Sequence, residues 1–75
     1  MIAAFLEDEY ESVDGSRVGA QELYLNYKLW CGMRGLRPLS LPQFKPEMVK
    51  KLGQPPQKTN EGLFWPGIRR RKAKN

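Results

Sequence analysis

Histidine is absent from this 75-residue chain, and cysteine occurs once, as Cys31. Without histidine, the chain lacks the side chain most used for acid–base catalysis and for binding transition metals. A single cysteine forms neither an intramolecular disulfide nor a zinc site, and Cys31 lies in an apolar stripe without an activating partner. We therefore expect no enzymatic activity, no metal site, no cofactor and no small-molecule substrate.

Long apolar runs are also missing. Glu7 and Asp8 interrupt the apolar stretch at the N-terminal end, so neither a signal peptide nor a membrane span is predicted. We expect a cytoplasmic protein, inside a bacterium or a virus-infected cell, with no membrane partner. A chain of 75 residues with three Phe, three Tyr and two Trp has material for one small core.

Basic residues are missing only from the start of the chain. Residues 1–16 carry −5, whereas residues 17–75 carry +10 and contain all 13 Lys and Arg. Such a chain is expected to turn its basic side toward a polyanion and its acidic side away. The alternative is that the basic residues only keep the protein soluble. The acidic run Glu7-Asp8-Glu9 predicts a solvated helix face rather than a metal site, because neighbouring helical residues point in different directions.

Apolar residues at helical spacing predict a first helix from about Ile2 to Ser12, with its acids turned outward. The turn-forming residues Asp14-Gly15-Ser16 are expected to end it. After this turn, Arg17-Val18 are expected to form a bridge strand of one or two residues.

A second helix is expected to open at Gly19 or Ala20 and to end near Arg34-Gly35, where glycine supplies a left-handed cap. Its residues at spacings of three and four are Leu23, Tyr24, Tyr27, Trp30 and Cys31. The aromatic members resemble a platform for stacked bases, but stacking platforms usually lie on exposed sheets. Helical spacing therefore favours a role in the core.

The third helix begins with a capping box, since Ser40 is followed three residues later by Gln43. On a helical wheel the core side contains Leu41, Phe44, Met48 and Leu52, and the opposite side contains Gln43, Pro46 and Lys50. Pro46 is unfavourable inside a helix because it lacks an N–H. Either the regular helix starts at Pro46, or it starts at Leu41 with an irregular first turn. The cap and the spacing of Phe44 favour Leu41.

A β-hairpin is predicted after Pro55-Pro56, which forces an extended exit from the third helix. Its strands are Gln57–Thr59 and Leu63–Trp65, joined by Asn60-Glu61-Gly62, and the second strand is expected to resume at Ile68. The fold class predicted is α+β: a winged helix-turn-helix with three helices followed by a two-stranded β-hairpin wing. The expected parts are one domain at 1–72, with an acidic first helix at 1–14, a second helix region at 17–35, a recognition helix at 40–53 and the wing at 56–69, and a disordered tail at 73–75.

Three motifs together resemble a known family. The segment Arg17–Cys31 contains Leu-Tyr-x-x-Tyr-x-x-Trp, Phe44 follows in the next helix, and Gly62–Ile68 places aromatic residues after a glycine. This pattern, which spans Phe5–Ile68, is similar to the small winged-helix domain that closes the primase-helicases of phages, satellite phages, plasmids and poxviruses. The resemblance implies a module behind a hexameric helicase that engages origin or template DNA. Since the chain lacks a nucleotide-binding loop, it implies an excised C-terminal domain or a free-standing relative.

A basic helix beside a basic hairpin predicts binding to DNA, with duplex as the expected form. The third helix would enter the major groove, where the Gln43 amide can pair with adenine. The expected DNA-binding residues are Gln43, Lys45, Lys50 and Lys51 in this helix, Lys58 and Asn60 in the hairpin, and Arg69, Arg70 and Arg71 after it. Glu47 would repel phosphate unless it accepts from a cytosine amine. The arginines are equally compatible with a disordered tail that attracts DNA without specificity.

Other functions stay open on the sequence. A winged helix can also dock proteins, and the acidic first helix would then bind a basic partner or a helicase or primase domain. A free-standing phage transcriptional regulator and an RNA-binding protein are further alternatives.

Overall fold

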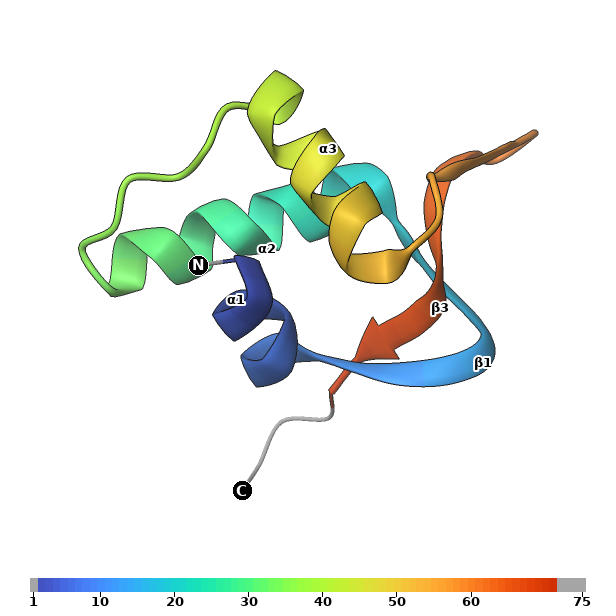
Figure 1. Ribbon diagram of the computed structural model, residues 1–75, viewed down its shortest axis with the longest axis horizontal. Coiled ribbons are helices and arrows are strands. Elements are labelled where there is room, and N and C mark those ends of the chain that lie inside the picture. Colours follow the sequence, from blue (N-terminus) through green and yellow to red (C-terminus); the bar gives the residue numbers. More distant parts are fainter. Residues whose placement is uncertain (1, 72–75) are drawn as a thin grey trace.

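The computed structural model describes residues 2–71 (Figure 1). In chain order the elements are α1 (Ile2–Glu9), β1 (Tyr10–Gly19), α2 (Ala20–Met33), α3 (Leu41–Leu52), β2 (Gln57–Thr59) and β3 (Gly62–Arg70). The strands form one antiparallel sheet in the order β1-β3-β2. The helices gather beside the long β1–β3 ribbon, so helices and sheet enclose one core (Figure 1).

The α+β class agrees with the sequence-based prediction, but the predicted order of three helices followed by a two-stranded hairpin is wrong. The ten-residue strand β1 separates α1 from α2 and makes the sheet three-stranded. Helix α1 ends at Glu9 rather than near Ser12, and the strand extends far beyond Arg17-Val18. The reason is nonlocal, because β1 pairs with residues 45 to 60 positions away in the chain.

The pairing of β1 with β3 is interrupted by a large bulge. Ser12 lies opposite Ile68 and Arg17 lies opposite Pro66, so residues 13–16 of β1 face a much shorter stretch of β3. Gly15 in the bulge has a φ of +84°, and Gly67 on the facing strand has a φ of +79°. Both values lie in the region that glycine adopts most easily. Asp14-Gly15-Ser16, predicted as a turn that ends the first helix, therefore form a bulge inside a strand instead.

Helix α2 supplies the aromatic centre of the core, as its spacing predicts. Leu23, Tyr27, Trp30 and Cys31 are buried, and Tyr24 is half-buried. The Phe5 ring of α1 packs edge-to-face on Tyr27 and Trp30, at centroid distances of 5.4 and 5.7 Å. Burial raises the pKa of the Tyr27 hydroxyl above its usual value. The aromatic stripe of α2 thus packs in the core and is not an exposed surface for bases.

Helix α3 starts at Leu41 with Ser40 as its N-cap, as predicted. The side-chain oxygen of Gln43 accepts hydrogen bonds from the Ser40 backbone N–H at 3.3 Å and from the Ser40 hydroxyl at 3.1 Å. The helix continues through Pro46 and is closed by Gly53, whose φ is +74°. Phe44 and Met48 are buried, whereas Leu41, predicted on the core side, is 52% exposed.

The connection between α2 and α3 is fastened by two tyrosines of α2. Tyr24 donates its hydroxyl to the carbonyl of Leu39 at 2.8 Å, and the Leu39 N–H donates to the Tyr27 hydroxyl at 3.0 Å. The Tyr27 ring also packs on Phe44 of α3, with centroids 4.5 Å apart. These contacts set the position of α3 on α2.

The β2–β3 hairpin lies where the sequence predicts it, although β3 runs without a break to Arg70. The hairpin is part of the sheet through β3, and Arg17 of β1 adds a side-chain contact to it, since its guanidinium donates to Glu61 at 2.7 Å and lies 4.1 Å above the Phe64 ring. The tail predicted at 73–75 lies outside the described residues, as does Lys72 of the predicted domain.

Candidate nucleic-acid interface

The outward face of α3 carries most of the polar residues that the sequence selects in this helix. Gln43, Lys45 and Lys50 are exposed, while Phe44 and Met48 hold the opposite face in the core. Lys50 lies 3.8 Å from Glu47 across one turn. Because both side chains are exposed, this pair is weak and leaves the ammonium available to a stronger anion.

Gln43 has two tasks on this face. Its amide oxygen caps the helix by accepting from Ser40, as described above. A bidentate contact with adenine needs both the oxygen and the N–H₂ group of the amide. While the cap is closed, only the N–H₂ group is left for a base.

The hairpin residues selected from the sequence, Lys58 and Asn60, are exposed. The hairpin and α3 project from the same side of the molecule (Figure 1). Between them runs a groove of about 560 Å³, in whose lining Lys45 of α3 meets Leu63 of β3. The groove also contains the carboxylates of Glu22 and Glu61. The two cation-bearing elements are therefore neighbours.

The arginine run lies elsewhere. It occupies the end of β3 beside α1, at the far end of the strand from the hairpin turn (Figure 1). Arg69 pairs with Glu11 of β1 at 2.9 Å, and Arg70 lies 3.6 Å from Glu9. Arg71 donates its Nε to the backbone carbonyl of Glu7 at 2.9 Å. These arginines belong to a folded, ion-paired surface as far as Arg71.

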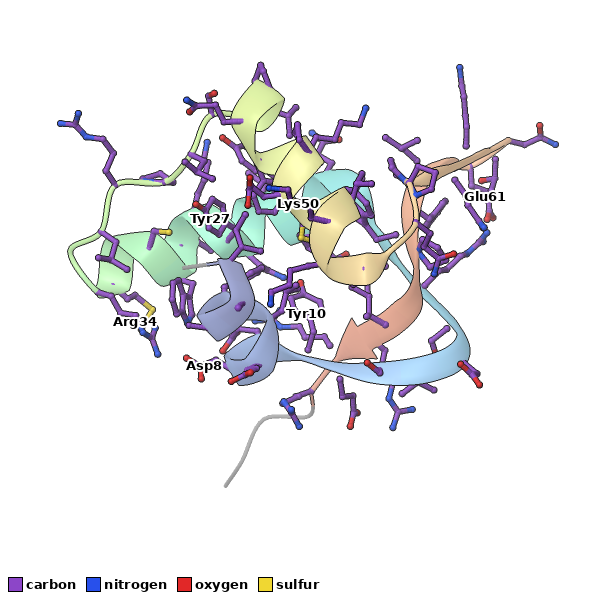
Figure 2. The ribbon with its side chains drawn as sticks, in the orientation of Figure 1. Asp8, Tyr10, Tyr27, Arg34, Lys50 and Glu61 are labelled. Atoms are coloured by element: carbon purple, nitrogen blue, oxygen red, sulfur yellow. The ribbon has the colours of Figure 1, made fainter. Side chains whose placement is uncertain are left out.

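A second ion pair on this surface joins α1 to α2. Asp8 accepts from Arg34 at 3.0 Å and from the indole N–H of Trp30 at 3.1 Å, and Figure 2 shows Asp8 and Arg34 side by side. We call this whole surface the acidic–arginine cluster; it comprises Glu7, Asp8, Glu9, Glu11, Arg34, Arg69, Arg70 and Arg71. Its four acids and four arginines balance. Part of the basic charge, from Arg34 and the arginine run, thus lies against the acidic segment, which the charge pattern alone does not predict.

The nine selected residues fall into two groups. Gln43, Lys45, Lys50, Lys58 and Asn60 lie on α3 and the hairpin. Arg69, Arg70 and Arg71 lie in the acidic–arginine cluster, and Lys51 borders it, because it lines the same hollow as Glu7 and Arg71. Since the cluster balances, the excess positive charge of the chain comes from the rest of the molecule, including the α3 and hairpin lysines.

Sequence reasoning missed the two residues that fix these groups in place, Arg17 and Asp8. Arg17 ties β1 to the hairpin, and Asp8 ties α1 to α2. A signal for Asp8 exists, since a buried tryptophan usually needs an acceptor for its N–H. No comparable local signal marks Arg17, whose partner Glu61 lies 44 residues away.

Within residues 2–71, no group of three or more His, Cys, Asp or Glu side chains is placed to hold a metal ion. None of the helices in that part of the chain has the length and apolar character needed to cross a membrane.

Comparison with known proteins gives one match. A family model described as Poxvirus D5 protein-like covers residues 1–73. Neither the curated proteins nor the solved structures contain a match to the chain. The family match links the chain to the D5-type primase-helicases, and so confirms at the family level the resemblance drawn from the Leu-Tyr-x-x-Tyr-x-x-Trp motif. DNA binding by the nine residues stays a prediction.

Proposed function

The chain belongs to the Poxvirus D5 protein-like family, and on this premise we propose that it is the DNA-binding module of a replication primase-helicase. The observation that carries the proposal is the outward face of α3. There Gln43 and Lys50 share the outward side and Lys45 lies on the flank of a helix whose other face is locked in the core. A helix presented in this way can enter the major groove while its lysines contact phosphates on either side.

Duplex DNA is the form that this surface fits best. Proteins that bind single strands usually offer exposed aromatic rings on which bases stack. All eight aromatic residues of this chain are buried or half-buried, and Phe64, one of the two half-buried, lies beneath the Arg17 guanidinium. With the rings engaged in this way, affinity would come from lysines that follow a regular phosphate backbone.

In the proposed complex, α3 lies in the major groove and the hairpin follows the adjacent backbone through Lys58 and Asn60. The Gln43 N–H₂ group would donate to a base edge without opening the cap at Ser40. The arginine run is not part of this contact, because its guanidinium groups face acids at the other end of β3. In this proposal the chain itself does no chemistry, and ATP hydrolysis belongs to other parts of a parent enzyme.

A pair of matched double variants tests which surface binds DNA. Lys45→Ala with Lys50→Ala should weaken duplex binding about tenfold or more and make the salt dependence shallower by about two phosphate contacts. Arg69→Ala with Arg70→Ala removes the same number of charges from the acidic–arginine cluster and should change duplex affinity little. Fluorescence anisotropy with a labelled duplex measures both. If only the arginine variant loses binding, the contact lies at the end of β3 and the proposed interface is wrong.

A second candidate function is docking onto another protein. One side of α2 exposes Leu25, Leu29 and Met33, which are 50%, 67% and 85% accessible. This surface is better suited to a protein partner than the acids of α1, which are already engaged by arginines. Failure of the chain to bind DNA at low salt would favour this function.

A further inference from the structure

The outward face of α3 is hollowed beside Pro46. The lining of this hollow, which we call the proline hollow, consists of Pro42, Lys45, Pro46, Val49, Pro55 and Pro56, and its volume is about 500 Å³. The last two prolines come from the connection between α3 and β2. Four pyrrolidine rings and a valine therefore form apolar walls along the flank of α3, and Pro46 joins this flank to the outward side that carries Gln43 and Lys50.

Pro46 is out of place by the rules of helix formation. It lies in the interior of α3, where a proline removes a backbone hydrogen bond and crowds the carbonyl four residues earlier. It is also exposed, so it adds nothing to the core. The helix forms because the Ser40–Gln43 cap and buried Phe44 support it. A residue that opposes local structure without serving the core is expected at a functional site.

The charges around the proline hollow distinguish it from two other hollows on the molecule. The groove between α3 and the hairpin is lined by Glu22 and Glu61, and the hollow beside α1 is lined by Glu7 and Glu11. Among residues 2–71, Lys45 is the only charged residue that lines the proline hollow. An apolar surface with a cationic rim can approach DNA without repelling phosphates.

We infer that the proline hollow receives the C5 methyl group of thymine when α3 lies in the major groove. This inference rests on the proposed function. The thymine methyl is the one apolar group that base pairs present on the major-groove floor, and small apolar side chains are its usual partners. Lys45 and Lys50 hold the flanking phosphates, and Pro46 with Val49 meets the methyl. The module would therefore prefer A·T-rich duplex sequence.

Replacing thymine by uracil tests this contact directly, because uracil lacks only the methyl group. Alternating A·T and A·U duplexes of equal length are titrated with the chain at fixed low salt. Burial of one methyl group predicts that the uracil duplex binds about fourfold more weakly. Equal binding of the two duplexes would overturn the inference and leave DNA binding intact. Absence of binding to either duplex would overturn the proposed function and the inference with it.

Pro46→Ala is the matched variant. Alanine restores the missing N–H and raises helix propensity, so the variant should fold with α3 intact, which circular dichroism checks. The thymine-to-uracil ratio should fall below about twofold while the lysine contacts maintain binding. Pro55→Ala, which lies outside the helix, should lower the ratio in the same direction. A fourfold ratio that persists in both variants would show that the methyl is recognised elsewhere.

Discussion

At the scale of single residues, Trp30 connects the core to the charged surface. Its ring packs on Phe5, its N–H donates to Asp8 at 3.1 Å, and the Arg34 guanidinium lies 4.3 Å above it. Truncating Trp30 therefore removes a core ring and also the two contacts that this ring makes with the Asp8–Arg34 ion pair. In a domain of this size, one such site can account for a large share of the folding free energy.

Trp30→Ala should lower the free energy of unfolding by about 3–5 kcal/mol. Leu29→Ala is the control, because Leu29 is next to Trp30 on α2 but its side chain is 67% exposed. This variant should lower the free energy of unfolding by less than about 0.5 kcal/mol. Urea denaturation followed by circular dichroism measures both. A Trp30→Ala variant with unchanged stability would show that α1 and α2 are held together without this ring.

Contacts between residues close in the sequence were predictable, and contacts between residues far apart in the chain were not. Ser40 and Gln43 lie three positions apart, so their cap is visible in the sequence. The partner of Glu11 is Arg69, which lies 58 positions away, and no local sequence pattern predicts that pair. For this reason the charge pattern alone could not predict that Arg69 and Arg70 pair with acids of α1 and β1.

At the scale of elements, the same distinction explains the fold. Helices α2 and α3 follow from their periodicity and caps, and the hairpin follows from a short turn. Strand β1 does not, because its stability comes from pairing with β3 and its first residues continue the apolar spacing of α1. Tyr10, which that spacing assigns to a helix, is instead a strand residue packed on Phe5 at 5.5 Å.

Arg17 reinforces the pairing of β1 with the hairpin through its side chain. Arg17→Met keeps much of the aliphatic stem but loses the 2.7 Å pair with Glu61 and the cation above Phe64. Since the pair is partly exposed, we expect the free energy of unfolding to fall by about 0.5–1.5 kcal/mol. Amide hydrogen exchange should become faster in β2 and in the first part of β3. Arg37→Met, at an exposed loop position, is the control. Unchanged exchange in the hairpin would mean that strand pairing alone holds it.

At the scale of the whole molecule, folding divides the basic side chains between two surfaces. The arginines at the end of β3 balance the acids of α1 and β1, whereas the lysines of α3 and the hairpin face solvent. An interface built on lysines should bind DNA through few phosphates and release few counterions. The number of cations that reach DNA is therefore the quantity on which the proposed interface rests.

The salt dependence of duplex binding measures that number. With three contacts, from Lys45, Lys50 and Lys58, log K should fall against log salt with a slope of about −3, at about 0.9 per phosphate. Single strands of the same length should bind more weakly. A slope near zero, or no duplex binding at low salt, would contradict the proposal that this chain is a DNA-binding module.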